Sequence, residues 1–375
     1  MRPSLLLRLC SNYQKYSGCL TIRALSSSAA TPLCLRNTEK LLVNRVRDIF
    51  EKAKEFFNGF CVGGHRGSPL SAPENTMESF QEAVNAKMDL VEFDLALSKD
   101  GEVVIMHDDD LLRTCGVEGN VSSFTLEELK IMNAGYLFYK DKYAFLQYIM
   151  FVFLMIQVEG CSSASTSHIN CFLANCNRRS LAKLILNIFR KVCRIPTLKE
   201  VVTFCHDNHV KMLFDVKDWS ASMVSQIVSI IKDNDLYDEV IVSSFYPWVS
   251  YAVKKADPKI LTGLTWRSCF FSYSDLENQN PRFAGLKHYA ASLLDIVNMK
   301  ALDAYLPAFL GVEMMLTHEK EISGSYVDLM SHMGVQVVAW TVNDKSQMLF
   351  YRNSLKVPFL TDNPNNSGDN IDLDT

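Results

Sequence analysis

The sequence predicts a parallel α/β fold of about eight strand–helix repeats, a number that favours a closed barrel over an open sheet. Two observations support this prediction. From Cys61 onward, short apolar runs alternate with segments whose apolar residues recur at helical spacing. The pattern extends over most of a 375-residue chain in which 48% of residues are hydrophobic and 21% are charged, which is a globular composition.

The expected strands are the short apolar runs of this pattern. They span residues 61–65, 90–98, 102–107, 211–217, 239–245, 260–266, 334–342 and 357–362, with one more near 311–316. The turn signal from Lys99 to Gly101 separates the second run from the third, as it does in a hairpin.

Helices are expected between these runs. Residues 221–234 and 247–257 carry apolar residues at helical intervals. Three helix starts have the spacing of a capping box, in which a polar residue precedes an acid by three positions: Asn75 with Glu78, Thr125 with Glu128, and Thr197 with Glu200.

One barrel domain is expected over residues 58–365, with a different kind of segment at each end. Residues 1–40 are rich in Arg and Ser and contain no acid before Glu39, which is typical of a mitochondrial transit peptide. A disordered basic tail has the same composition and stays an alternative. Residues 366–375 form a polar tail that we expect to be disordered.

Residues 143–193 interrupt the strand–helix pattern. The run from Tyr143 to Val158 holds 16 uncharged residues, whereas a membrane span needs about 20 apolar ones. Three interpretations stay open. The segment is an insertion on the catalytic face that caps the site or touches a membrane through residues 143–158, a gene-model artefact, or a true span that would split the barrel.

Charge and cysteine content argue against two classes of function. A formal net charge of -4 gives no electrostatic basis for binding nucleic acid. The 11 cysteines contain no CxxC pair, so a zinc site is not indicated, and we expect these cysteines to be mostly reduced and buried.

Three acids stand where strands should end. Glu92 and Asp94 are two positions apart, so their side chains lie on the same face of one strand, and Asp215 holds the corresponding place in another. If those strands are neighbours, the three carboxylates converge at the carboxyl-terminal mouth of the barrel. Carboxylates this close need a cation to stay ionised, and oxygen ligands suit Mg²⁺ or Ca²⁺.

Two histidines, His65 and His107, also stand at strand ends, where one could take a proton and the other could give one. Arg66 and Lys217 add the positive charge that a phosphoryl group requires. The glycines around His65 allow the backbone to approach such a group closely. Each residue alone has an ordinary structural explanation, but together they indicate chemistry at a metal-bound phosphate.

In combination and order, these motifs resemble those of the glycerophosphodiester phosphodiesterase family. The FDVK and VVAWTVN stretches are most similar to the animal membrane-type members. The resemblance covers about residues 61–363 apart from the insertion and rests on HRG at 65–67, PENT at 73–76, VEFD at 91–94, HDDDLLRT at 107–114, IPTL at 195–198, FDVK at 214–217, SSF at 243–245, WTVN at 340–343 and TD at 361–362.

The resemblance implies a TIM (β/α)8 barrel, with its insertion on the catalytic face, that hydrolyses glycerophosphodiesters to sn-glycerol 3-phosphate and an alcohol. It implies one divalent cation, Mg²⁺ or Ca²⁺, and attack on phosphorus by the substrate's own vicinal hydroxyl. Many members carry Glu where this chain has the shorter Asp215, which could change the ion preference. The implied roles are acid and base for His65 and His107, metal ligands for Glu92, Asp94 and Asp215, phosphate contacts for Arg66 and Lys217, a glycerol or acyl contact for Trp340, and support of the site by Glu74.

Two other functions stay open. A lysophospholipase D would make lysophosphatidic acid from lysophospholipids or N-acyl glycerophosphoethanolamine, and the apolar insertion and the aromatic residues between Tyr289 and Phe309 favour it. A catalytically dead barrel would bind lipids or protein partners. The location is open as well, because the N-terminal composition favours mitochondria while the resemblance to membrane-type members favours a membrane.

Overall fold

Eight parallel strands close into a TIM (β/α)8 barrel, as the sequence predicts. The computed structural model describes residues 51–140 and 192–366. Their sheet has the order β1-β9-β8-β7-β6-β5-β4-β2-β3, and the pairing of β1 with β2 closes the barrel. The barrel strands are β1 (Val62–Gly64), β2 (Leu90–Leu97), β4 (Lys211–Val216), β5 (Val240–Ser244), β6 (Leu261–Trp266), β7 (Met314–His318), β8 (Gln336–Trp340) and β9 (Phe359–Thr361).

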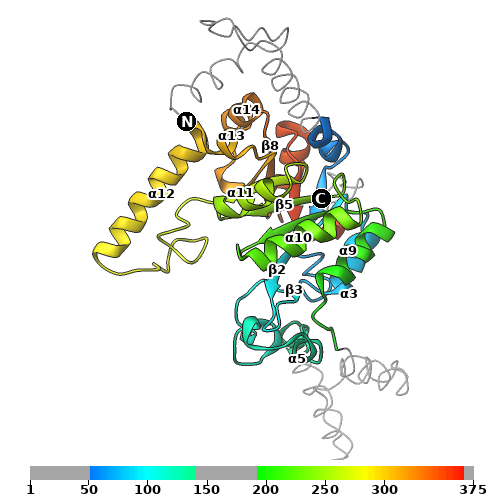
Figure 1. Ribbon diagram of the computed structural model, residues 1–375. Helices are drawn as coiled ribbons and strands as arrows, with labels where there is room; N and C mark the ends of the chain where they lie inside the picture. The colour runs from blue at the N-terminus through cyan, green and yellow to red at the C-terminus, as the bar shows by residue number, and fades with distance from the viewer. Residues whose placement is uncertain (1–50, 141–191, 367–375) are drawn as a thin grey trace, which may run out of the picture.

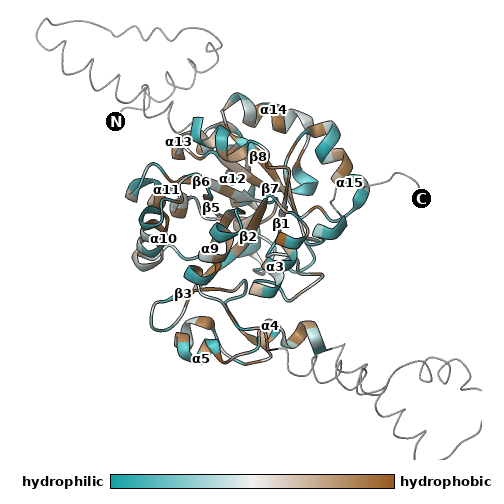
Figure 2. Ribbon diagram, turned by 90° about the vertical axis from the view of Figure 1, so that its right-hand side faces the viewer, coloured by the Kyte–Doolittle hydropathy of each residue, from teal (hydrophilic) through white to brown (hydrophobic). Residues whose placement is uncertain are grey.

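Helices surround the strands, which lie at the centre of the molecule in Figure 2. The connections between consecutive barrel strands carry α3 (Met77–Asn85), α9 (Leu198–Asp207), α10 (Ala221–Asp233), α11 (Pro247–Ala256), α12 (Leu286–Ala304), α13 (Leu306–Leu310), α14 (Gly324–His332) and α15 (Lys345–Leu349). A π-helical turn follows at Phe350–Leu355, and 3-10 turns lie at Val121–Ser123, Glu319–Glu321 and Pro364–Asn366.

Side-chain alternation along the strands divides the core into two layers. On β2, Val91 and Phe93 face outward and pack in the cluster between sheet and helices, where the ring of Phe93 lies 5.1 Å from that of Phe214. Leu90 and Leu213 face inward and belong to the cluster inside the barrel, which Phe56 and Phe60 extend at the amino-terminal end of the strands. This inner cluster leaves the inward-facing positions at the carboxyl-terminal ends of β2 and β4 available for polar side chains.

The expected hairpin is present beside the barrel. β3 (Val103–Ile105) pairs antiparallel with β2, so it extends the sheet and is not a barrel strand. Beyond it, α4 (Leu112–Cys115) and α5 (Leu126–Lys130) pack around a small apolar cluster of their own that includes Val104, Leu111 and Leu129. This unit lies at the lower end of the molecule in Figure 1, next to the end of β2.

Two of the three predicted capping boxes are confirmed, and the third is wrong. Thr125 and Thr197 cap α5 and α9 with reciprocal bonds to their glutamates. Before α3, the cap is Thr76, whose side chain accepts from the backbone N–H of Ser79, and not Asn75. Asn75 lies one residue earlier with a positive φ of 56° and turns its side chain into the barrel.

Several predictions fall on other parts of the chain. The targeting segment expected at residues 1–40, nearly all of the insertion expected at 143–193 and the tail beyond residue 366 lie outside the described residues. Within residues 51–140 and 192–366, no helix is both long enough and apolar enough to cross a membrane. Cys115, Cys193 and Cys205 are buried, as expected for small apolar residues, and Cys61, Cys115, Cys205 and Cys269 are free thiols.

Candidate active site

Three carboxylates meet at the carboxyl-terminal mouth of the barrel. β2 and β4 are neighbours in register, with Asp94 opposite Asp215, and Glu92 lies two residues before Asp94 on the same inward face. One oxygen from each of the three side chains lies within 4.8 Å of the others, and all three residues are buried. The convergence expected from the sequence is therefore present, and we call these residues the acidic triad.

The electrostatics of the acidic triad fit a cation. Burial, followed by repulsion from Asp94, raises the pKa of Asp215 to about 6 and that of Glu92 well above its ordinary value. Burial would also raise the pKa of Asp94, but Lys217 and Arg66 lower it. Two of the three carboxyls thus resist ionisation, and a divalent ion would supply the positive charge that favours their ionised form. Three buried oxygen donors suit Mg²⁺ or Ca²⁺.

His65 follows β1 and lies on one side of the acidic triad. Its Nδ1 donates to Oδ1 of Asp362 at 2.7 Å, and its Nε2 lies 4.0 Å from Oε2 of Glu92. Burial, and then the charge of Arg66, lower the pKa of His65, while Asp362 opposes this shift. The ring is therefore held through one nitrogen and presents the other to the mouth of the barrel.

His107 follows β3 and repeats this arrangement beside Asp94. Its Nδ1 donates to Oδ1 of Asp108 at 2.5 Å, and its Nε2 lies 4.0 Å from Oδ1 of Asp94. The backbone N–H of Met106 donates to the carbonyl of Asp94 at 3.0 Å, which ties the histidine loop to β2. Each histidine thus has an aspartate on Nδ1 and a different triad carboxylate beside Nε2.

The HRG turn needs its glycines. Arg66 has a φ of 52° and Gly67 a φ of 87°, and a Cβ on Gly64 would lie 2.2 Å from the carbonyl oxygen of Gly67. This tight turn directs the backbone N–H of Arg66 onto Oε2 of Glu92 at 2.7 Å. The turn thereby fixes one carboxylate of the acidic triad as well as the position of His65.

Glu74 links two arginines. Its carboxylate accepts from Arg66 at 3.1 Å and from both terminal nitrogens of Arg113, at 3.0 and 2.6 Å. Burial alone would raise the pKa of Glu74, but Arg113 and Arg66 lower it. Arg113 also contacts the Asp108 carboxylate that holds His107, with Nε 2.5 Å from Oδ2. Glu74 therefore contacts two positively charged side chains next to the acidic triad, a position that suits the supporting role implied for it.

Lys217 and Asn75 complete the surroundings of Asp94. Nζ of Lys217 donates to Oδ1 of Asp94 at 3.2 Å and to the carbonyl of His107 at 2.7 Å. Nδ2 of Asn75 donates to Oδ2 of Asp94 at 2.9 Å, and Nε of Arg66 lies 3.4 Å from the same oxygen. Two hydrogen-bond donors and the nearby guanidinium of Arg66 thus favour the ionised form of Asp94, whose pKa is lowered while the pKa values of its two triad partners are raised.

Aromatic rings line another side of the mouth. Trp340 ends β8, and its indole N–H donates to the carbonyl of Leu316 at 3.1 Å. Its ring lies 6.0 Å from that of Phe245, which stacks on Phe270 at 4.6 Å and 8°. These three rings, which we call the aromatic wall, come from the ends of β5, β6 and β8.

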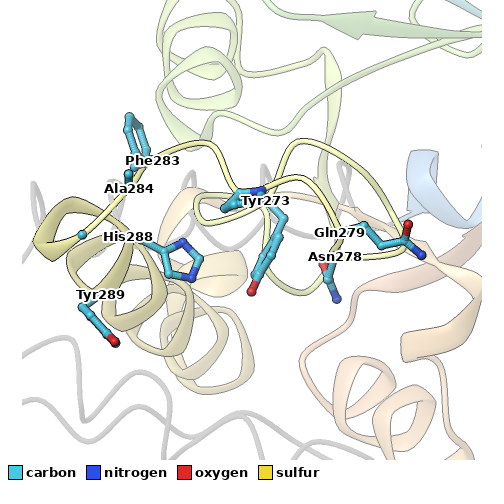
Figure 3. A pocket seen from close by; sticks show the side chains of 9 residues that line it. Tyr273, Asn278, Gln279, Phe283, Ala284, His288 and Tyr289 are labelled. Atoms are coloured by element: carbon cyan, nitrogen blue, oxygen red, sulfur yellow. The ribbon is translucent and has the colours of Figure 1, made fainter.

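A separate hollow of about 430 Å³ lies away from these residues. It is bounded by the loop after β6 and by the first turn of α12, and Tyr273 and His288 point toward one another across it (Figure 3). Their rings are 5.2 Å apart at 87°. Its lining includes no residue of the acidic triad and neither candidate histidine, so it is not part of the candidate active site.

Sequence reasoning did not assign roles to several residues that shape this site. Asp362, Asn343, Asp108, Arg113 and Asn75 each contact a candidate residue or its partner. All five lie inside the motifs WTVN, TD, HDDDLLRT and PENT, so the motifs were the signal that could have found them.

Comparison with known proteins gives a family for this arrangement. A model of the glycerophosphoryl diester phosphodiesterase family matches residues 65–366. Glycerophosphodiester phosphodiesterase 1 of Mus musculus is 29% identical over 301 residues, which are 80% of this chain and 76% of the mouse protein. The human protein of the same name is 26% identical over 300 residues, with the same shares covered.

Solved structures agree with the fold. The Oleispira antarctica phosphodiesterase OLEI02445, solved with the product sn-glycerol-3-phosphate, has a TM-score of 0.54 and 19% identity and covers 83% of this chain and 97% of its own. Glycerophosphodiester phosphodiesterase from Agrobacterium tumefaciens has a TM-score of 0.54 and 14% identity and covers 82% and 98%. Because the family match also contains every candidate site residue, the chain belongs to the glycerophosphoryl diester phosphodiesterase family and is a phosphoric diester hydrolase.

Proposed function

We propose that the protein hydrolyses glycerophosphodiesters to sn-glycerol 3-phosphate and an alcohol, using one divalent cation and two histidines as acid and base. The observation that carries this proposal is the placement of the two rings. Nε2 of His65 and Nε2 of His107 each lie 4.0 Å from a carboxylate oxygen of the acidic triad, Glu92 for the first and Asp94 for the second. A phosphoryl group bound at the triad would therefore lie near both rings.

Glu92, Asp94 and Asp215 would hold the cation. When bound, such a cation neutralises charge that develops on the phosphoryl oxygens. Arg66 and Lys217 add positive charge from the protein, since both reach Asp94 at 3.4 and 3.2 Å and therefore lie within reach of a group bound there. The side chain of Asp215 is shorter than that of a glutamate, and we expect this length to influence which ion the site prefers.

The histidines would move the protons. One Nε2 takes the proton of the substrate's vicinal hydroxyl as that oxygen bonds to phosphorus. The other Nε2 gives a proton to the alcohol oxygen as its bond to phosphorus breaks. The product of this step is a cyclic phosphate, which water opens to sn-glycerol 3-phosphate with the two proton transfers reversed. Asp362 and Asp108 hold Nδ1 of each ring, so that Nε2 is the nitrogen that exchanges the proton.

Release of glycerol 3-phosphate from glycerophosphoinositol and glycerophosphocholine by the purified protein tests this function. We expect release with Mg²⁺ or with Ca²⁺ and none with EDTA. Release that is unchanged by EDTA would contradict the cation, whereas no release from a folded, metal-loaded protein would favour acylated substrates or a barrel without catalytic activity.

A lysophospholipase D activity is the second candidate, because the aromatic wall offers an apolar surface at the mouth. Trp340, Phe245 and Phe270 are in contact there, whereas Tyr289 and Phe309 are exposed residues of α12 and α13. Activity on lysophosphatidylcholine that rises with acyl chain length, and that Phe245→Ala lowers more than activity on glycerophosphocholine, would establish it. Equal effects of Phe245→Ala on both substrates would exclude an acyl contact at this wall.

A further inference from the structure

Helix α12 exposes its apolar side. Leu286 is 87% exposed, Tyr289 73% and Leu293 63%. Leu294, Ile296 and Val297 are also exposed, and together the six residues form one continuous face at helical spacing, which we call the α12 stripe. Apolar residues normally face the core in a surface helix, so a stripe of this size marks a binding surface.

The opposite side of α12 is fastened to the barrel by a polar residue. The carboxylate of Asp295 accepts from the backbone N–H groups of Phe271 and Ser272 at 2.8 and 3.0 Å, and from the hydroxyl of Ser272. Ala291 and Leu302 are the buried residues of this side. Rotation of α12 to bury the stripe would break the bonds of Asp295, so the outward orientation is fixed by the fold.

The charges on α12 indicate what the stripe contacts. Lys287 and Lys300 are exposed at the stripe, whereas the two acids are only partly exposed: Asp295 lies on the opposite side of α12, and Asp303 borders the stripe near the end of the helix. The exposed charged side chains of α12 are therefore both lysines, and they accompany large apolar side chains. That combination is the one by which a helix lies in the headgroup region of an anionic bilayer.

We propose that the α12 stripe docks on the surface of a lipid bilayer that contains anionic lipids. The helix lies in the plane of that surface and does not span it, in agreement with the finding that no helix of the described residues can cross a membrane. Two further aromatic residues are exposed next in the chain, Tyr305 at the junction of α12 and α13 (56%) and Phe309 in α13 (58%). A second copy of the chain fits less well, since stripes facing each other would place the exposed lysines of both copies in one apolar interface.

Vesicle sedimentation with the full-length chain tests the proposal. We expect the protein to sediment with vesicles of equal parts phosphatidylcholine and phosphatidylserine, and less with phosphatidylcholine alone. Leu293→Glu/Val297→Glu should lower partitioning at least about tenfold. Ile131→Glu, which changes an equally apolar side chain that is 81% exposed outside the stripe, should leave it unchanged. Lys287→Gln/Lys300→Gln should weaken binding about tenfold on the anionic vesicles only.

Folding of each variant is checked by circular dichroism melting, which does not depend on activity. If the double glutamate variant does not fold, the double glutamine variant carries the test, because exposed lysines contribute little to stability. Wild-type protein that stays in solution with both kinds of vesicle would overturn the proposal. Stripe variants that sediment like wild type would overturn it as well. So would a wild-type protein that binds no vesicles but forms a dimer, if the glutamate substitutions convert that dimer to a monomer.

Discussion

Asp362 holds Nδ1 of His65 at 2.7 Å although 297 positions separate the two residues. The pairing of β1 with β9, with Gly64 opposite Thr361, places the residues that follow each strand side by side. Asn343 fixes the aspartate in turn, because its amide donates to Oδ2 of Asp362 at 2.7 Å and its carbonyl accepts from the Asp362 backbone at 2.8 Å. The orientation of His65 therefore depends on closure of the barrel by its last strand.

Asp362→Asn should lower kcat at least about 100-fold with little change in KM. The amide of the variant can donate to Nδ1 of His65, which favours the tautomer that carries its proton on Nε2. Nε2 then cannot accept a proton, and the protonation state that the reaction requires of His65 is lost. Steady-state release of glycerol 3-phosphate measures the effect. Asp344→Asn is the matched control, since this residue caps α15 at the surface and Asn caps equally well. A kcat near that of wild type in Asp362→Asn would mean that the aspartate does not orient the ring.

His65→Ala and His107→Ala should each lower kcat on glycerophosphocholine at least about 100-fold. A substrate with 4-nitrophenol as leaving group separates the two roles, because this phenol departs without being protonated. We expect one variant, the one that lacks the acid, to recover most of its turnover on the nitrophenyl substrate, while the other does not. Recovery of both variants, or of neither, would contradict the division of labour.

Stability of the metal-free protein should fall as pH rises from about 4 to about 6. Burial, then repulsion from Asp94, raises the pKa of Asp215 from 3.8 to about 6. Over that range the unfolded chain loses a proton that the folded chain keeps, so the folded state binds more protons and raising the pH favours unfolding. Asp94 affects stability at lower pH. Because its pKa is lowered in the folded state, its contribution to the stability of the fold is lost as pH falls below 3.8.

Asp215→Asn removes this titration and tests it. In EDTA at neutral pH the free energy of unfolding of the variant should be higher by on the order of 2 kcal/mol, because the buried side chain at position 215 no longer has to ionise. Mg²⁺ or Ca²⁺ should stabilise wild type and have little effect on the variant. Urea denaturation at several pH values measures both, with exposed Asp109→Asn as control. An EDTA-treated variant that is less stable than wild type would refute this account of the acidic triad.

The fold and the centre of the site could be predicted because they depend on local periodicity. Alternation along β2 placed Glu92 and Asp94 on one face, and strand ends placed the histidines. The register that sets Asp94 opposite Asp215 could be expected only on the condition that their strands are neighbours, since pairing between distant strands has no local signal.

Asn75 shows why the rest could not be predicted. Asn75 with Glu78 has the spacing of a capping box as good as that of Thr125 or Thr197, yet Thr76 is the cap. The choice is made by a distant residue, because the amide of Asn75 donates to Asp94 at 2.9 Å inside the barrel. A local rule cannot weigh a tertiary hydrogen bond, and for the same reason the partners Asp362 and Arg113 gave no signal beyond their motifs.

Gly64→Ala should reduce both stability and activity, because the added Cβ would meet the backbone oxygen of Gly67 at 2.2 Å and has no flexible side chain to displace. The HRG turn must open, which moves the Arg66 N–H away from Glu92 and His65 away from the acidic triad. We expect the free energy of unfolding, measured by urea denaturation, to fall by about 1 to 3 kcal/mol, and kcat to fall as well.

Gly324→Ala is the control, since a Cβ there meets no atom within 4 Å and the residue begins α14. That variant should be neutral or slightly stabilised. If Gly64→Ala behaved like this control, close packing of the turn could not be what positions the histidine.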